Sequence, residues 1–306
     1  MNPALAIPDA IRQAGTRTTL SPTGADPRLS AFNRFSGFTP HNETSMRAPE
    51  VDDGRFKAVI AAWEEFVKRP HGMAAKPKDM FRVEWMYREA KSLVKGLCHS
   101  SRDVASFSLI LHEYETASAF RHEIDRFQKK SGLFLNALMN TCPDEGFEIS
   151  TERLQHPPDF LCLWNSKHVI IHGNAGDSFC QQMRDGSAVL DGDCQDNACA
   201  YLTGGDVLIK GGSGAYLCNE MEGGNVVVEK GTFDYCGWSM SGGTLRIKGM
   251  VEGEVGMGMN GGTIYADGAY GLSIGNTITG GRIIHHGKQV WPEDSQPSWL
   301  GRIWPK

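Results

Sequence analysis

The sequence predicts an α+β protein: a small N-terminal helical domain followed by a right-handed parallel β-helix of about seven 19-residue coils. Gly-Gly doublets recur at the constant spacing 204–205, 223–224, 242–243, 261–262 and 280–281, and apolar residues repeat at fixed places between them. Residues 54–141 show a helical period instead. A fixed period of about 20 residues, with β-rich runs between glycine turns, is typical of a solenoid. Parallel strands that are joined in one direction almost always wind right-handed.

Composition excludes several functional classes. The 306 residues carry a formal net charge of −5 with both signs mixed, which argues against a dedicated nucleic-acid binder. No run of 18 apolar residues exists, so we expect no membrane span. The N-terminus lacks the charged-then-apolar pattern of a signal peptide, so we expect a cytoplasmic protein. Eight cysteines without a CxxC pattern indicate reduced, mostly buried thiols.

The chain divides into four segments by composition. Residues 1–50 are rich in Ser, Thr, Pro, Asn and Gly, which predicts a disordered or loosely docked arm. Residues 51–145 form the helical domain and residues 146–290 the β-helix. The end of a β-helix is an open sheet edge, and the tail 291–306, with its tryptophans and prolines, is expected to cap it.

Three apolar stripes predict three or four helices, with charged residues on their opposite faces. The first, stopped by Pro70, contains Phe56, Val59, Ile60, Trp63, Phe66 and Val67. The second contains Met80, Val83, Met86, Ala90, Leu93, Val94 and Leu97. The third, with Ser101 as the expected N-cap, contains Val104, Phe107, Leu111, Tyr114, Ala117, Ile124 and Phe127.

Four columns of apolar residues are expected to line the β-helix. Position 1 of successive coils is Lys167, Gly186, Gly205, Gly224, Gly243, Gly262 and Gly281. Position 3 is Val169, Ala188, Val207, Val226, Leu245, Ile264 and Ile283, and position 5 is Ile171, Leu190, Ile209, Val228, Ile247 and Ala266. Position 13 is Phe179, Ala198, Leu217, Cys236, Val255 and Ile274, and position 17 is Met183, Leu202, Met221, Met240, Met259 and Ile278.

The charges at position 6 support this register independently. The column reads His172, Asp191, Lys210, Glu229, Lys248, Asp267 and His286, so the sign alternates at every step. Neighbouring coils lie about 4.8 Å apart, where opposite charges attract and like charges repel. A slip of one residue in any coil would destroy both this ladder and the apolar columns.

The repeat resembles a known sequence family. Residues 249–262 and 268–281 are similar to the GXXGXXXG repeat found in the C-terminal domain of glutamate synthase large chains and in one chain of formylmethanofuran dehydrogenase. The small chains of N-methylglutamate synthase-type enzymes carry the repeat as well. The resemblance covers residues 167–287 and implies a right-handed β-helix that braces catalytic domains or neighbouring chains without carrying a catalytic residue. Cys180, Cys199 and Cys218 stand where later coils keep glycine.

Apolar side chains on the outside of the β-helix mark a candidate interface. Position 4 points outward, yet it holds Ile170, Val189, Leu208, Val227, Arg246, Tyr265 and Ile284. A strand that is apolar on both faces is covered on both faces. Tyr216 and Tyr235 at position 12, with Trp238, add outward aromatic surface. These residues are the candidate binding surface.

Three other patterns could carry chemistry, and each has a structural interpretation that we prefer. The cysteines at position 14 are too far apart for one tetrahedral metal, because the first and third lie two coils apart. Residues 256–261 match GxGxxG but lead into a strand and not a helix. A zinc motif that begins at His112 fails because Thr116 replaces the second histidine. We therefore expect no catalytic residue, cofactor or metal.

The sequence favours a non-catalytic structural or assembly subunit. Its expected partners are protein subunits, such as glutaminase-like or flavin or iron–sulfur synthase-like chains, or further copies of itself. One alternative is an enzyme or binding protein that acts on carbohydrate through Asp191, Asp193 and Asp196. Turn formation and the charge ladder, which already explains Asp191, are the interpretation of these aspartates that we prefer. Another alternative is an adaptor whose helical domain binds a specific partner.

Overall fold

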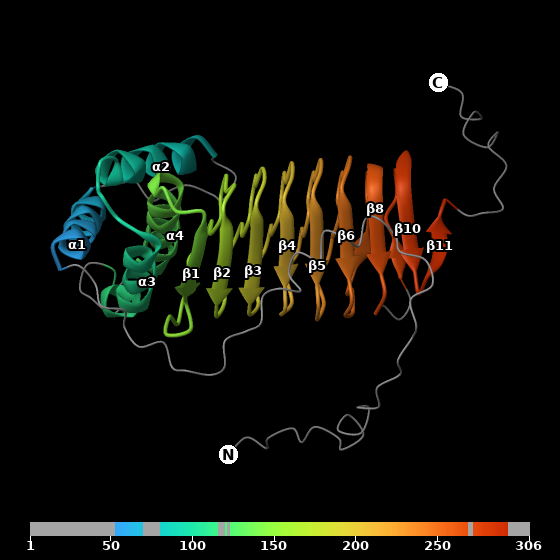
Figure 1. The fold of residues 1–306 in the computed structure, drawn as a ribbon. Coiled ribbons are helices and arrows are strands. Elements are labelled where there is room, and N and C mark those ends of the chain that lie inside the picture. Colours follow the sequence, from blue (N-terminus) through green and yellow to red (C-terminus); the bar gives the residue numbers. More distant parts are fainter. Residues whose placement is uncertain (1–52, 70–79, 116–119, 121–122, 269–271, 293–306) are drawn as a thin grey trace, which may run out of the picture. The chain divides into compact units, whose positions relative to one another are not determined.

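The computed structural model describes residues 53–69, 80–115, 120, 123–268 and 272–292. The chain divides into two compact units, 1–45 and 46–306, and all described residues belong to the second. The predictions for residues 1–50 and for residues 293–306 of the tail lie outside the described residues. The described residues confirm the fold class, with four helices followed by a parallel β-helix of about seven 19-residue coils (Figure 1).

The helices are α1 (Asp53–Lys68), α2 (Met80–Val94), α3 (Ser101–Glu115) and α4 (Ile124–Thr141). The rings of Trp63, Phe107 and Phe134 form the centre of their core, with centroids 5.5 Å (Trp63–Phe107) and 5.3 Å (Trp63–Phe134) apart. The third predicted stripe is divided between two helices, because α3 ends at Glu115 and α4 begins at Ile124.

The N-cap of α3 is Ser100, one residue before the predicted N-cap. Ser101 is the first residue of the helix, and its backbone N–H donates to Asp144 Oδ2 (2.8 Å). Ser100 donates to Asp103 Oδ2 from both its backbone N–H (2.8 Å) and its Oγ (2.7 Å). The bond from the N–H of Ser100 to the side chain of Asp103, the third residue of the helix, is one half of a capping box, so Ser100 is the N-cap.

Nine strands form one sheet along the β-helix. In sheet order they are β1 (Gly146–Ser150), β2 (His168–His172), β3 (Ser187–Asp191), β4 (Asp206–Ile209), β5 (Asn225–Val228), β6 (Thr244–Ile247), β8 (Asn260–Ala266), β10 (Gly280–His285) and β11 (Lys288–Trp291). From β2 to β8 every paired residue lies 19 positions from its partner, as in Val207↔Val226. β7 (Glu254–Val255) and β9 (Ser273–Ile274) pair in a second, two-stranded sheet.

The predicted interior columns are buried. All residues of positions 3 and 5 are at most 1% exposed, and so are positions 13 and 17 as far as Val255 and Met259. Ile274 and Ile278, which end these two columns, are partly exposed. The second glycine of each doublet has a φ between +78° and +88°, which begins the next strand after a tight turn.

The side opposite the sheet has an unusual backbone. In the four coils from Lys167 to Gly242, positions 12, 14 and 16 have positive φ values although most of them are not glycine, as in Asn197 (+60°), Cys199 (+57°) and Tyr201 (+56°). The N–H of Asn197 and that of Tyr201 donate to the following coil, whereas the N–H of Cys199 donates to the preceding one. The alternation lets a segment that is not a regular strand hydrogen-bond both neighbouring coils.

Helices α3 and α4 cover the first edge of the β-helix with buried polar side chains. Asn136 of α4 donates from Nδ2 to Phe160 O and accepts from Cys162 N–H (2.8 Å) at Oδ1. Glu115 of α3 accepts from the backbone N–H groups of Gln155 (3.0 Å) and His156 (2.7 Å). The approach of α4 is close, since a Cβ on Gly132 would lie 1.7 Å from Asp159 O. The helices therefore satisfy backbone groups that an open edge would expose.

The far edge is covered differently. β11 pairs with β10 in the antiparallel direction, and Trp291 lies opposite Ile283. This strand turns the chain back over the last parallel strand. Its last residue, Trp291, is the first residue of the tail for which a capping role is predicted.

Candidate functional site

The outer face of the sheet carries the predicted apolar stripe. We define the outer face as the side chains at positions 2, 4 and 6 of β2 to β6 and β8. Position 4 alternates with the buried positions 3 and 5, so Ile170, Val189 and Leu208 point outward and are half-buried. Val227 is 6% exposed. Of the strands in this sheet, β1 is the one that the described helices contact extensively, so the strands of the stripe have no comparable helix contact within the described residues.

At its C-terminal end the stripe becomes polar. Arg246 follows Val227 in the column, and its guanidinium carbon lies 4.3 Å from the ring centroid of Tyr265. Its Nη1 also lies 2.7 Å from Asp267 Oδ2. The charge of Arg246 is therefore neutralised within the face, and its guanidinium group also makes a cation–π contact with Tyr265.

The charge ladder at position 6 flanks the stripe. Lys210 Nζ lies 3.3 Å from Asp191 Oδ1, and Lys248 Nζ lies 3.0 Å from Glu229 Oε1. His172 lies 3.8 Å from Asp191 but closer, at 2.7 Å, to Glu148 of β1. The coil register thus aligns the column as predicted. Each of these exposed pairs contributes less than about 1 kcal/mol.

An aromatic cluster lies on another side of the β-helix. The rings of Tyr216 and Tyr235 stack at 5.2 Å with an interplanar angle of 15°. Trp238 lies 5.6 Å from Tyr216 and 5.9 Å from Tyr235, and it is 36% exposed. Three large rings that protect one another and still reach solvent are typical of a contact surface.

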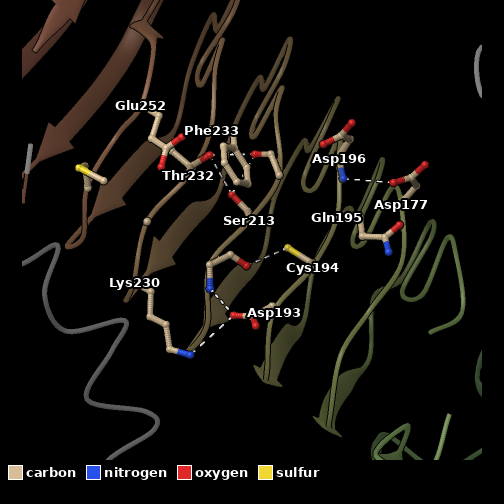
Figure 2. Close-up of a pocket in the computed structure, with 14 residues that line it drawn as sticks. Asp177, Asp193, Cys194, Gln195, Asp196, Ser213, Lys230, Thr232, Phe233 and Glu252 are labelled. Carbon is tan, nitrogen blue, oxygen red and sulfur yellow. Dashed lines mark hydrogen bonds and ion pairs between the residues drawn. The ribbon is translucent and has the colours of Figure 1, made fainter. Parts of the chain in front are cut away.

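A groove of about 710 Å³ crosses five coils beside this cluster. Figure 2 shows its carboxylates, Asp177, Asp193, Asp196 and Glu252, with Lys230 as a cation. Phe233, which is 55% exposed, and Met250, which is 54% exposed, add apolar surface. Gly212 and Gly214 line it and leave the coil between the aspartates and Phe233 without bulky side chains.

The three aspartates of the carbohydrate alternative do not act together. Asp193 and Asp196 line the groove, whereas Asp191 belongs to the charge ladder. Asp193 Oδ1 accepts the N–H of Gly212 (2.8 Å), and Asp196 Oδ1 accepts the N–H of Ala215 (2.8 Å). Each of the two therefore hydrogen-bonds the backbone of the next coil.

The series of aspartates extends further than the repeat indicates. Asp159 Oδ1 accepts the N–H of Asp177 (3.0 Å), and Asp177 Oδ1 accepts the N–H of Asp196 (3.1 Å). Burial, and next the charge of Asp177, raise the pKa of Asp159 to about 7. The step from Asp159 to Asp177 is one position shorter than the period of the later coils, so a strict repeat does not reveal it.

The cysteine column also has a member that the sequence analysis missed. Cys162 precedes Cys180 in the column, again by a step one position shorter than the period, so four consecutive coils each bury one thiol completely. Burial, followed by hydrogen bonding with neighbouring thiols, raises the pKa of Cys180 and that of Cys218. All eight cysteines are free, and no group of three or more His, Cys, Asp or Glu within the described ranges is arranged to hold a metal ion.

No family model, curated protein or solved structure matches the chain. Among the residues that the structure describes, no helix is both long and apolar enough to cross a membrane. The outer face, the aromatic cluster and the groove are therefore the features on which a function can rest.

Proposed function

We propose that this protein is a non-catalytic structural or assembly subunit that binds protein through the outer face of its sheet. The observation that carries the proposal is the half-buried stripe of Ile170, Val189 and Leu208, on strands that the described helices do not contact extensively. An apolar stripe with charges along one side resembles the anatomy of protein interfaces, which have an apolar centre and a polar rim.

Two further observations support this role. The resemblance of residues 167–287 to the GXXGXXXG repeat associates the β-helix with glutamate synthase-like and formylmethanofuran dehydrogenase-like complexes, so a glutaminase-like or flavin or iron–sulfur synthase-like chain is the kind of partner we propose. The eight free cysteines fit a reducing compartment, and we place the protein in the cytoplasm.

The test is the composition of the complex in the source cell. The tagged chain, isolated at its natural level, should elute at a mass above that of one chain, with any second protein present in a fixed ratio. Leu208→Lys places a charge in the centre of the stripe and should reduce that complex strongly. Elution of the wild-type chain alone, at the mass of one copy, would contradict the proposal.

The adaptor alternative has its own observation. In α2, Phe81 is 87% exposed and Trp85 is 46% exposed, so the helical domain also presents aromatic surface. Phe81→Lys is the comparison variant for Leu208→Lys, because both replace an apolar side chain that reaches the surface with lysine, the first on α2 and the second on the half-buried stripe. Loss of the complex with Phe81→Lys alone would favour the adaptor, and loss with Leu208→Lys alone would favour the outer face.

The carbohydrate alternative rests on the groove. Carboxylate acceptors beside the exposed ring of Phe233 are a combination that can bind sugar hydroxyls and a sugar face. Asp193→Asn and Asp196→Asn, made together with Phe233→Ala, should abolish binding on a glycan array if this alternative holds. The assembly role predicts that the same variant keeps its protein complex.

A further inference from the structure

The groove contains an aromatic ring and a carboxylate in adjacent coils with no cation between them. Phe233 and Glu252 both stand at position 10, and the pairing of Thr232 with Val251 fixes their register. Neighbouring coils lie about 4.8 Å apart, so both side chains reach the groove from adjacent places (Figure 2). Phe233 is 55% exposed, and its ring makes no aromatic or cation–π contact within the described part of the chain. Glu252 is exposed as well, and its carboxylate has no ion pair or hydrogen bond to any residue that the structure describes.

The outer face shows how this fold holds a guanidinium group with the same two kinds of side chain. The guanidinium carbon of Arg246 lies 4.3 Å from the ring centroid of Tyr265, and its Nη1 lies 2.7 Å from Asp267 Oδ2. The ring attracts the cation through its face, and the carboxylate accepts a charge-assisted hydrogen bond. In the groove, Phe233 and Glu252 supply the ring and the carboxylate, but the arginine is missing.

The charge of the groove favours a cation as the ligand. Its lining includes four carboxylates, those of Asp177, Asp193, Asp196 and Glu252. Lys230 is the one cation among the described lining residues, and its Nζ lies 3.7 Å from Asp193 Oδ1. Three negative charges therefore remain when all four carboxylates are ionised. A neutral sugar would leave these charges uncompensated, whereas a cationic ligand complements them.

We propose that the groove binds an extended segment of another protein that carries two arginines four positions apart. Asp177 and Asp196 stand at position 11 of two successive coils, and Phe233 and Glu252 lie three coils further on, at a distance of about 14 Å. Four residues of an extended chain span about 13 Å, and side chains an even number of positions apart point to the same face. One guanidinium group then contacts Phe233 and Glu252, and the other contacts the aspartates.

Arginine fits these two ends better than lysine does. Its planar guanidinium group stacks on an aromatic face and binds a carboxylate through two parallel hydrogen bonds, which an ammonium group does not do. Between the two ends the groove is lined by Gly212 and Gly214, so it has room for the backbone of an extended chain. A Cβ on Gly214 would lie 2.2 Å from Asp196 Oδ1, so a side chain there would displace the carboxylate.

This surface is separate from the one on which the proposed assembly role rests. The groove is formed by positions 7 to 11 of its coils, whereas the outer face consists of positions 2, 4 and 6. The arginine-bearing segment is therefore a second partner. Leu208→Lys, which disrupts the outer face, should leave binding to the groove unchanged, so the two proposals can fail independently.

Titration of the full chain with defined peptides tests the inference. The probes are blocked, fluorescently labelled peptides of glycine and serine with two arginines, placed either four positions apart or next to each other. Fluorescence anisotropy at low salt should show at least about tenfold tighter binding of the first peptide, because adjacent arginines point to opposite faces and cannot reach both ends. Two lysines four positions apart should bind more weakly than the matching arginines, and added salt should weaken binding.

Variants of exposed residues locate the binding site. Glu252→Gln and Phe233→Ala should each weaken binding of the first peptide about fivefold or more, because each removes one of the two groups that hold a guanidinium. Glu229→Gln makes the same change as Glu252→Gln on the outer face and should leave the affinity unchanged. Lys230→Gln removes the cation of the groove and should tighten binding about threefold, an effect that a loss of structure cannot produce.

Four results would overturn the inference. No binding of the first peptide at about 1 mM excludes the site. Equal affinity for the two arginine arrangements means unspecific attraction by charge. Weaker binding by Lys230→Gln, or unchanged binding by Glu252→Gln and Phe233→Ala, places the peptide elsewhere. Binding of the wild-type chain to a neutral glycan that Phe233→Ala abolishes, without binding of the peptide, assigns the groove to the carbohydrate alternative.

Discussion

The side chain of Ile264 occupies the space beside Gly237 inside the β-helix. A Cβ on Gly237 would lie 2.5 Å from Cδ1 of Ile264, which is closer than two carbons can approach. Gly256 has the same relationship with Ile283, whose Cδ1 would be 3.0 Å away. Position 14 of one coil therefore packs against position 3 two coils later.

This contact explains why cysteine changes to glycine along position 14. Counted with the same offset, Cys180, Cys199 and Cys218 correspond to Val207, Val226 and Leu245. The two glycines correspond to Ile264 and Ile283. Interiors are close-packed, so Cys180 and Cys199 fit beside the smaller valines, whereas an isoleucine leaves room only for glycine; Leu245, beside Cys218, has the volume of isoleucine but a different branch point. The departure from the glycine pattern is a packing adjustment.

We predict that Gly237→Cys destabilises the protein by about 2–4 kcal/mol, because the new side chain overlaps Ile264 and adopts a positive φ. Ile264→Val removes the Cδ1 atom and costs about 1 kcal/mol alone. The double variant should recover about 1–2 kcal/mol relative to the sum of the two. Urea unfolding of all four proteins measures this coupling, and strictly additive costs would refute the shared space.

A second prediction concerns the covered edge of the β-helix. Asn136→Ala leaves the buried N–H of Cys162 without its partner and removes one of the two donors to the carbonyl of Phe160, which keeps the N–H of Leu163 (3.1 Å), so we expect a loss of about 2–3 kcal/mol. Asn140→Ala is the matched control. Its Nδ2 bonds Tyr87 in a part-buried place (3.1 Å), and its removal should cost about 1 kcal/mol.

The readout is hydrogen exchange combined with urea unfolding. If Asn136 caps the edge, amides of the first coils should lose protection before those of β5 and β6, because the opening begins where the backbone groups lose their partner. Equal loss of protection along the whole β-helix would mean that Asn136 supports the global fold only.

Much of the fold could be predicted because the β-helix is locally repetitive. One strict period placed Val207 over Val226 and Lys248 beside Glu229, since each coil sees nearly the same surroundings as the next. The first coil could not be aligned in this way. Its step is one position shorter than the period, which concealed both Cys162 and Asp159, whose partners lie in the following coil.

The role of the helices could not be predicted from their period. Their apolar stripes located the helices, but charged residues were expected to face solvent. Lys130 is fully buried, and Glu115 is 6% exposed. Both bond backbone groups that lie far away in the sequence, and a helical period carries no information about such partners.

A third prediction follows from Lys130. Its Nζ donates to three carbonyl oxygens at the end of α1, those of Phe66 (2.6 Å), Val67 (3.1 Å) and Arg69 (2.8 Å). Lys130→Met keeps the apolar stem but removes all three donors, so we expect a loss of about 2–3 kcal/mol. Thermal unfolding compares it with Lys129→Met, which loses a long pair with the exposed Asp125 (3.9 Å) and a charge that acts on Asp159, and should change stability by less than about 1 kcal/mol.

The last prediction concerns pH. Burial and the charge of Asp177 raise the pKa of Asp159 from 3.8 to about 7 in the folded chain. As pH rises, the unfolded chain releases the proton of Asp159 before the folded chain does. The stability that the protonated Asp159 contributes is therefore fully present below about pH 4 and is lost as the pH increases through 7. A pKa that differs by about three pH units between the folded and the unfolded chain corresponds to about 4 kcal/mol in the free energy of unfolding.

Asp159→Asn removes the charge and keeps an oxygen that can accept the N–H of Asp177 (3.0 Å). The variant should match the wild type near pH 4 and be more stable by about 2 kcal/mol at pH 8, since the buried amide offsets part of the gain. Urea unfolding at both pH values measures the difference, with the exposed Asp185→Asn as control. Asp177, Asp125 and Lys129 also act on Asp159. If the free energy of unfolding of the variant changes between pH 4 and 8 as much as that of the wild type, the pH dependence comes from those neighbours and not from Asp159.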